Sequence, residues 1–432
     1  MASLIKPPVI LAGLDSLQGL QTARVFAQRQ VPVIGLAADP RHFCCRTNAC
    51  HSVRFVDIRS EKLVADLEQI GPSFKSRPVL IPCVDEAVLL VSHHRQMLEK
   101  WYRFSLPDQE MVEIATDKSQ FYRFAESHGF PVPKSFVVRN PDDLLNASMQ
   151  LTFPCVLKPR GRSHAWKNHS ALKAFKVESQ SRLQQLYEVC RSWCDVLVLQ
   201  EWIPGSDAEL YTCNAYFDTQ SRPQATFVSH KLRQWPPEVG GEGCLSEECR
   251  KDEVLHESLR LFSLMGLRGL GYLEMKHDPR SGRYIIIEPN IGRPTGRSTL
   301  AEAGGVEMLY TMYCDLLGWP LPEDRIQKYT GVKWIHLVRD VASSMHYWRR
   351  GQLRPFDWLQ SLRGDKVYAV FSLKDPGPFC GDVMRAFRML LSPSERIRRK
   401  PDQQPTNIWG KSEKLTRQGV ECYEISSQSE VS

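Results

Sequence analysis

Two carboxylates and one amide side chain occupy a predicted β-hairpin in the second half of the chain. Glu274 falls in a strand-like segment over residues 269–276, and Glu288 and Asn290 fall in a second one over residues 284–290. The turn between the segments contains Asp, Pro, Ser and Gly, which favours a hairpin. Oxygen ligands of this kind suit magnesium, which combines a few protein oxygens with waters and substrate phosphates. The hairpin therefore predicts a metal site.

The predicted register brings the three ligands together. If Asp278 pairs with Tyr284, then Glu274 lies directly opposite Glu288, and period-two alternation places Asn290 on the same face as Glu288. Like charges opposed across a ladder are destabilising, and a divalent cation reverses that penalty. The alternative is a solvent-facing hairpin with hydrated acids, which a register slip would produce.

Two lysines precede this hairpin at positions suited to phosphate binding. Lys118 lies at the start of a predicted helix that begins near Thr116, which we expect to cap it, and Lys158 ends a predicted strand over residues 153–158. A lysine ammonium is a compact point charge that suits phosphate oxygens. Either lysine alone is more often an ordinary surface residue. A further buried strand follows over residues 196–203.

Strands and helices alternate in the first hundred residues. Short apolar strands are predicted over residues 9–12, 31–36 and 79–82, and helices over residues 17–30 and 86–98. Such alternation predicts a parallel α/β layer. The turn after the first strand is a weak dinucleotide-binding pattern, because it lacks the full set of glycines.

Composition and charge restrict the class of protein. The 432 residues are 42% hydrophobic and 24% charged, which predicts a globular protein with two or three domains. Residues 331–400 contain fourteen Lys or Arg against six Asp or Glu, so an anionic partner or a solvated basic face is expected there. We expect a cytoplasmic protein, since no secretion signal and no run of roughly 20 apolar residues is present.

The thirteen cysteines are scattered and odd in number, which favours reduced thiols over a disulfide framework. The group Cys44, Cys45, Cys50 and His51 could bind zinc, but it lacks a second ligand pair at familiar spacing. Buried structural thiols are the preferred interpretation.

The order of these residues resembles that of the ATP-grasp superfamily over roughly residues 8 to 318. The matched positions are Lys118, Lys158, Glu201, Trp202, Ile203, Glu274, Glu288, Asn290 and Arg293. The resemblance implies a mixed α/β and α+β fold, with a Rossmann-like pre-ATP-grasp domain (1–115) and a two-subdomain ATP-grasp domain (116–318). Beyond the matched region, composition predicts a small basic C-terminal extension (319–400) and a polar tail (401–432).

The resemblance also implies roles for residues at the nucleotide. Lys118 and Lys158 would bind phosphates of ATP, with Lys158 also near the adenine. The backbone of Glu201 and Ile203, on either side of Trp202, would bind the adenine edge. Asp207 or Glu209 would lie near the ribose.

Further roles concern the metal and the transferred group. Glu274, Glu288 and Asn290 would hold one or two magnesium ions, with manganese as the alternative ion. Arg293 would steady the transferred phosphoryl group. One departure is the segment after Lys158, residues 159–167, where many members have a glycine-rich loop and this chain has a single glycine. Arg160, Arg162 and Lys167 could supply charge over the phosphates instead.

Within the superfamily, residues 230–237, followed by two glycines, are similar to the carboxylate–amine ligases related to D-aspartate ligase. Lys231 and Arg233 would form an electrostatic clamp on an acyl phosphate, and the alternative is a basic edge strand. The expected function is an ATP-dependent ligase that activates a small-molecule carboxylate and joins it to an amine. The alternatives are carboxylation, transfer to a non-amine acceptor, and a non-catalytic ATP-binding regulatory or scaffold protein.

An amphipathic segment lies near the C-terminus. Residues 383–400 combine an apolar helical stripe with a run of arginines, which permits peripheral contact with an anionic surface at the inner face of the membrane. An ordinary packed helix is the preferred alternative. A nucleic-acid partner is not expected, since the basic residues do not form a recognisable binding module. No oligomeric state is predicted.

Overall fold

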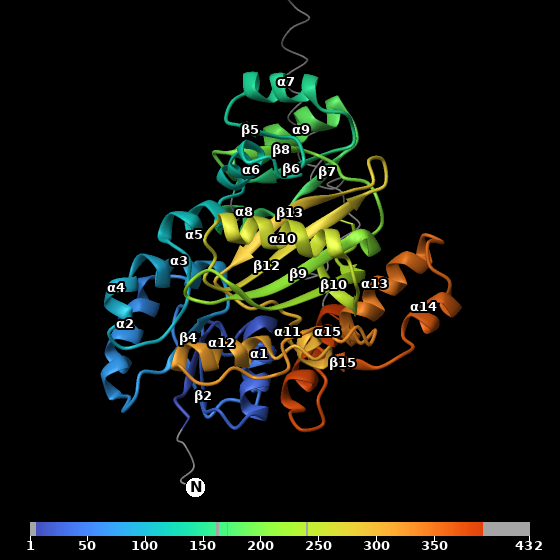
Figure 1. Ribbon diagram of the computed structural model, residues 1–432. Helices are drawn as coiled ribbons and strands as arrows, with labels where there is room; N and C mark the ends of the chain where they lie inside the picture. Colours follow the sequence, from blue (N-terminus) through green and yellow to red (C-terminus); the bar gives the residue numbers. More distant parts are fainter. Residues whose placement is uncertain (1–5, 161–163, 171, 239–240, 392–432) are drawn as a thin grey trace, which may run out of the picture.

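The computed structural model describes residues 6–160, 164–170, 172–238 and 241–391, and Figure 1 shows their arrangement. The four-stranded sheet of the N-terminal region is parallel, in the order β3-β2-β1-β4, as the alternation of strands and helices predicts. Its strands are β1 (Val9–Ala12), β2 (Val33–Ala37), β3 (Ser52–Phe55) and β4 (Val79–Pro82). Its helices are α1 (Leu17–Gln28), α2 (Glu61–Ile70), α3 (Asp85–His93) and α4 (Arg95–Leu98).

The start of the next helix differs from the prediction. Thr116 is the last residue of α5 (Gln109–Thr116), and its hydroxyl bonds back to the Val112 carbonyl. Asp117 is the cap of α6 (Lys118–Ser127), because its carboxylate accepts from the amides of Ser119 and Gln120. An aspartate at this position satisfies amides that a helix start leaves unpaired, so Lys118 is held at the first turn.

A second four-stranded sheet is antiparallel, in the order β5-β8-β6-β7. Its strands are β5 (Ser135–Val138), β6 (Cys155–Pro159), β7 (Phe175–Val177) and β8 (Leu197–Glu201), with helices α7 (Pro141–Gln150), α8 (His164–His169) and α9 (Gln180–Cys190). The sheet has its own apolar cluster, which includes Leu157, Trp166 and Leu199. This sheet, with α7 and α9, forms the top of the molecule in Figure 1.

A seven-stranded sheet has the order β13-β12-β9-β10-β11-β14-β15, antiparallel except for the last pair. Its strands are β9 (Leu210–Phe217), β10 (Pro223–Trp235), β11 (Glu242–Glu248), β12 (Gly269–Asp278), β13 (Arg283–Ile291), β14 (Lys333–Ile335) and β15 (Lys366–Tyr368). The accompanying helices are α10 (Asp252–Leu264), α11 (Ser298–Ala303), α12 (Met308–Leu317), α13 (Leu337–Arg349), α14 (Pro355–Ser361) and α15 (Gly377–Leu391). Two strands from residues 319–400 therefore extend this sheet.

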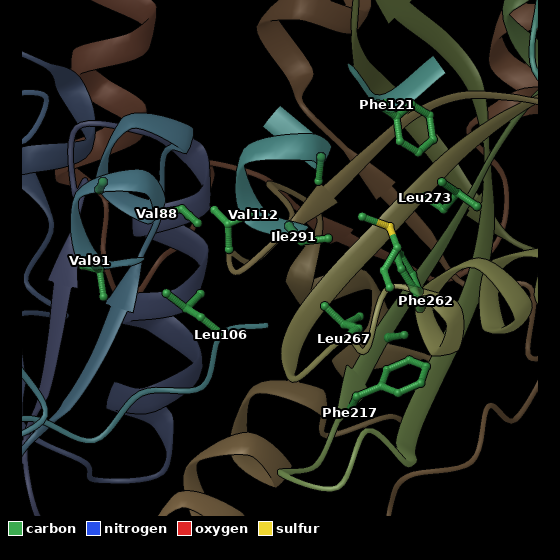
Figure 2. Packing of buried hydrophobic residues seen from close by; sticks show 14 of the residues in the cluster. Val88, Val91, Leu106, Val112, Phe121, Phe217, Phe262, Leu267, Leu273 and Ile291 are labelled. Carbon is green, nitrogen blue, oxygen red and sulfur yellow. The ribbon is translucent and has the colours of Figure 1, made fainter. Parts of the chain in front are cut away.

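One apolar cluster joins the N-terminal region to the large sheet. Val88 of α3 and Val112 of α5 belong to the same cluster as Leu273 of β12, Ile291 of β13 and Phe262 of α10 (Figure 2). Burial of this apolar surface stabilises the contact between the two regions. The ends of the parallel strands are thereby held beside the β12–β13 hairpin.

Two remaining predictions concern metals and membranes. Within the described ranges, no group of three or more His, Cys, Asp or Glu side chains could hold a metal ion, so the zinc alternative near Cys44 has no support. No helix in the described part of the chain is long and apolar enough to cross a membrane. Membrane contact through residues 383–400 stays a prediction, because residues 392–400 lie outside the described ranges.

Candidate active site

The β12–β13 hairpin places its two acids opposite each other, as predicted. Glu274 pairs with Glu288, but the register at the turn differs from the prediction, since Asp278 pairs with Arg283. A β-bulge leaves Ile287 without a partner residue and restores the pairing at the acids. The expected opposition is therefore confirmed, although the predicted register is wrong by one residue near the turn.

Glu274, Glu288 and Asn290 line one large cleft, with a volume of about 1660 Å³. Each carboxylate has a lysine beside it. Lys118 Nζ lies 3.4 Å from Glu288 Oε2, and Lys231 Nζ lies 3.2 Å from Glu274 Oε1. These cations offset the repulsion between the acids, and a donor set of two carboxylates and an amide fits a hard divalent cation.

Glu288 is ionised over the whole neutral range. Burial alone would raise the pKa of this carboxyl, but the positive charges of Lys118, Lys173 and Lys158 lower it to about 2. The same carboxylate raises the pKa of Lys118. A carboxylate in this state is ready to bind a cation.

Lys158 is buried near the end of β6, where it contacts one residue of α6 and one of β8. Its ammonium donates to Gln200 Oε1 at 2.7 Å and to the Tyr122 hydroxyl at 3.0 Å. Burial lowers the pKa of Lys158 to about 7, and the nearby charge of Lys118 contributes. An anion bound beside Lys158 would therefore raise the pKa of this lysine and favour its protonated form.

Arg293 connects three elements of the site. Its guanidinium donates to the carboxylate of Asp85, at the start of α3, to the hydroxyl of Tyr272 on β12, and to Oδ1 of Asn290 on β13. The Asn290 side-chain nitrogen is buried and has no hydrogen-bond partner among the described residues. Asn290 Oδ1 keeps a second lone pair for a cation beside the hydrogen bond that it accepts from Arg293.

Lys231 and Arg233 lie on different sides of β10. Lys231 lines the cleft beside Glu274. Arg233 instead forms a bidentate ion pair with Asp340 of α13, in which Nε donates to Oδ1 at 2.8 Å and Nη2 donates to Oδ2 at 3.1 Å. A bulge in the pairing with β11, between Lys231 and Arg233, breaks the alternation that would put both on one face. The expected Arg233 clamp is therefore not carried forward, and Gln234 lines the cleft instead.

Arg297 also lines the cleft, although it is not among the residues that the sequence predicts for the site. It is 7% exposed, donates to Thr212 Oγ1 at 2.8 Å and lies 3.7 Å from Glu274 Oε1. Its position four residues after Arg293 is the one signal that could have identified it. The two arginines, together with Lys231, make this part of the cleft strongly cationic.

Glu201, Trp202 and Ile203 line the cleft at the end of β8, as the resemblance implies. Two ammonium groups lie near the Trp202 ring, with Lys176 Nζ at 4.9 Å and Lys276 Nζ at 5.1 Å from the ring centroid. The site therefore offers an aromatic surface and backbone edges beside the cationic region.

Asp207 and Glu209, expected near the ribose, do not line the cleft. Asp207 is buried, where it accepts from Gln234 Nε2 at 2.8 Å and from the Tyr347 hydroxyl. Glu209 instead contacts His277 Nδ1 at 3.0 Å. The short helix η3 (Asp207–Glu209) turns both side chains away from the cleft lining. Their predicted ribose contacts have no geometric support.

The glycine-poor segment after Lys158 is only partly described. Arg160 lies 2.5 Å from Asp117 Oδ2, next to the start of α6. Residues 161–163 and the side chain of Lys167 lie outside the described part of the chain. The charges expected to cover the phosphates at Arg162 and Lys167 remain a prediction.

Comparison with known proteins gives sequence relatives and a common fold, while no family model matches the chain. The chain is 26% identical to a D-aspartate ligase of Enterococcus faecium (strain Aus0004) over 234 residues, which is 51% of this chain and 54% of the relative. It is 22% identical to a D-alanine–D-alanine ligase of Pseudomonas putida (strain GB-1), over 41% of this chain and 54% of the relative. The chain thus spans about half the length of these curated relatives.

The solved structures extend the likeness to most of the chain. An ADP complex of N5-carboxyaminoimidazole ribonucleotide synthetase matches with a TM-score of 0.59 at 14% identity, covering 81% of this chain and 87% of that one. At this identity, the match shows the fold. Together with the sequence relatives, it confirms the expected resemblance to ATP-grasp carboxylate–amine ligases.

Proposed function

We propose that this protein is an ATP-dependent ligase, which activates a substrate carboxylate as an acyl phosphate and joins it to an amine. The observation that carries the proposal is the opposition of Glu274 and Glu288 on the wall of a cleft that Asn290 also lines. Lys118 and Lys158 face the same cleft. Carboxylate ligands beside two lysines suit a nucleotide triphosphate with its metal.

Glu274, Glu288 and Asn290 would hold one or two magnesium ions, with manganese as the alternative. The metal, when bound, supplies positive charge that offsets the charge of the phosphate oxygens. Lys118 and Lys158 would bind phosphate oxygens directly. Because the pKa of Lys158 lies near 7, phosphate binding would convert this side chain fully to its charged form.

The residues of the cleft then serve two chemical steps. In the first, a carboxylate oxygen of the substrate attacks the γ-phosphorus, the bond to the bridging oxygen breaks, and ADP leaves. Arg293, held by Asp85 and Tyr272, would steady the transferred group. In the second, an amine attacks the acyl carbon, inorganic phosphate leaves with the electron pair, and the nitrogen loses a proton. Lys231 and Arg297 would stabilise the acyl phosphate between these steps.

The sequence relatives support this reaction class, since those compared are named as ligases of amino acids. Because the chain spans about half of each relative, the activity and substrates are proposed for this chain on the geometry of its own cleft. A cationic region around Arg293 and Arg297 suits a carboxylate substrate and its phosphorylated form.

The test is a screen for ADP release with amino acids and small carboxylates supplied in pairs. A productive pair should stimulate ADP release and yield an amide of the combined mass. Glu288→Gln should lower this release at least about 100-fold, because it removes a charged ligand. Glu253→Gln, at an exposed site in the first turn of α10, is the matched control and should release ADP like the wild type.

A second candidate is a carboxylation reaction, which the fold of N5-carboxyaminoimidazole ribonucleotide synthetase favours. Bicarbonate added as the only carboxylate, with the same set of amines, separates it from amide formation. Tight ATP binding without ADP release in any arm would instead support a regulatory or scaffold protein. Either result would reject the ligase proposal.

A further inference from the structure

Helix α13 presents a polar stripe to the end of β10, buried at Asp340 and Ser343 and half-buried at Tyr347. Its residues Asp340, Ser343 and Tyr347 are spaced by three and four positions, which places them on one face of the helix. Asp340 pairs with Arg233, and the Ser343 hydroxyl donates to the backbone carbonyl of Gln234 at 2.9 Å. The helix thus holds the strand just beyond Lys231, although it comes from a region predicted to lie outside the ATP-grasp domain.

The third residue of the stripe begins a chain of contacts that ends at the metal ligands. The Tyr347 hydroxyl donates to Asp207 Oδ2, and Gln234 Nε2 donates to Asp207 Oδ1 at 2.8 Å. Gln234 Oε1 accepts from Lys231 Nζ at 3.4 Å, and Lys231 Nζ lies 3.2 Å from Glu274 Oε1. Asp207, Gln234 and Lys231 are all buried, so water does not compete freely for these contacts.

The orientation of the Gln234 amide depends on the charge of Asp207. A side-chain amide has one donor end and one acceptor end, a carboxylate only accepts, and an ammonium only donates. Ionised Asp207 therefore takes the NH₂ end of Gln234, which leaves the oxygen facing Lys231. Lys231 is then held between Gln234, the Gly241 carbonyl at 3.3 Å, and Glu274.

We propose that Tyr347 is a positioning residue for Lys231, which acts through Asp207 and Gln234 to hold the ammonium against Glu274. The inference rests on the proposed function and deepens it, because it makes a C-terminal helix part of the machinery of the cleft. Tyr347 itself does not touch the reacting atoms.

The groups around Asp207 determine its protonation state, and with it the orientation of the Gln234 amide. Burial raises the pKa of this carboxyl, whereas the Tyr347 hydroxyl, the charge of Lys231, the Glu238 amide and Gln234 lower it. Other titratable groups that face Asp207 are Lys276 on β12, Cys244 on β11 and the side chain of Glu238 beyond β10, the last through Tyr347.

Removal of the Tyr347 hydroxyl favours the protonated form of Asp207. A protonated Asp207 can donate to Gln234 Oε1, which turns the NH₂ end of the amide toward Lys231. The Gln234 NH₂ group and the Lys231 ammonium are both donors, so they repel each other and Lys231 is no longer held against Glu274. Because protonation of Asp207 displaces Lys231, the loss of activity increases as pH falls and decreases as pH rises.

The test compares Tyr347→Phe with the wild-type full-length protein, using ADP release with a productive substrate pair between pH 6 and 8.5. We expect kcat to fall about tenfold at the acid end of this range, as is usual for groups that orient a ligand, and the loss to become smaller as pH rises. The Kd for ATP should not change. Asp207→Asn should reduce kcat equally at every pH, since its amide does not titrate. Tyr368→Phe, on the edge strand β15, is the control and should behave as the wild type.

An activity-independent measurement completes the test. Each protein is treated briefly with an N-hydroxysuccinimide acetate, and acetylation of Lys231 is quantified by mass spectrometry against Lys158 in the same sample. Tyr347→Phe should raise the Lys231 labelling several-fold at pH 7 and leave Lys158 unchanged. Equal Lys231 labelling in the two proteins, or a kcat loss that is the same at all pH values, overturns the proposal. If the wild type releases no ADP with any pair, the proposed function fails, and the labelling alone decides the positioning of Lys231.

Discussion

Replacing Arg233 by methionine separates a structural role from the catalytic role that its sequence position predicts. Arg233 and Asp340 are 5% and 1% exposed, and two hydrogen bonds of 2.8 and 3.1 Å join them. Removal of one partner from a buried pair leaves the other charge without compensation, which costs about 3–5 kcal/mol. Asp340 keeps a hydrogen bond from Trp358 Nε1 at 3.0 Å, so we expect the lower end of this range.

Thermal unfolding followed by circular dichroism measures the effect. A loss of about 3 kcal/mol corresponds to a midpoint lowered by roughly 6–12 °C in a domain of this size. The double variant Arg233→Met/Asp340→Leu should recover most of the loss, because no buried charge is left unpaired. The surface control is Arg354→Met, whose partner is Asp357 and whose side chain is 82% exposed, and it should cost at most about 1 kcal/mol.

The activity of the folded variant supplies the second half of the test. ADP release by Arg233→Met, measured well below its unfolding midpoint, should stay within about threefold of the wild-type rate, since an indirect effect through packing is modest. An unchanged midpoint together with abolished ADP release would refute the structural assignment. It would also restore Arg233 as a clamp on the acyl phosphate.

Three further outcomes follow from the site and from the backbone. At pH 8, Lys158 is mostly neutral because its pKa lies near 7, so ADP binding should take up most of a proton. Calorimetry in buffers of different ionisation enthalpy measures this uptake, and Lys158→Met should abolish it. The same lowered pKa means that the unfolded chain binds more protons between about pH 7 and 10, so the free energy of unfolding should rise with pH there, less steeply in Lys158→Met. Gly269→Ala should lower the unfolding midpoint strongly, because φ is +90° and an added Cβ would lie 2.2 Å from the Ser105 carbonyl oxygen; Gly266→Ala, with φ +58° and open space around it, should cost only about 1 kcal/mol.

The local pattern of the chain was sufficient for the main features of the cleft. Strand periodicity and turn residues predicted that Glu274 and Glu288 would oppose each other, and the structure confirms this. The order of Lys118 and Lys158 before the hairpin predicted a common phosphate region, and both lysines line the same cleft. The hairpin is a short segment, whose strands and turn are set largely by their own residues. The lysines were placed by the resemblance to the ATP-grasp superfamily.

Bulges limited the accuracy of the prediction. One bulge at Ile287 restored the expected pairing of the acids, whereas another, after Lys231, turned Arg233 toward α13. A bulge is a mismatch between two paired strands, so a single strand read alone does not reveal it. Alternation of side chains is dependable only where the partner strand stays in register.

The sequence by itself determined the acidic hairpin with Glu274 opposite Glu288, because strand period and turn chemistry are local properties. The phosphate and metal roles of the cleft residues stay a proposal. Only the tertiary structure determines that Asp207 accepts hydrogen bonds from Tyr347 and Gln234 and does not line the cleft. Tyr347 lies 140 residues after Asp207 in the chain. Contacts between such distant segments are set by the packing of whole elements, here α13 against the end of β10, and leave no periodic signal in either segment.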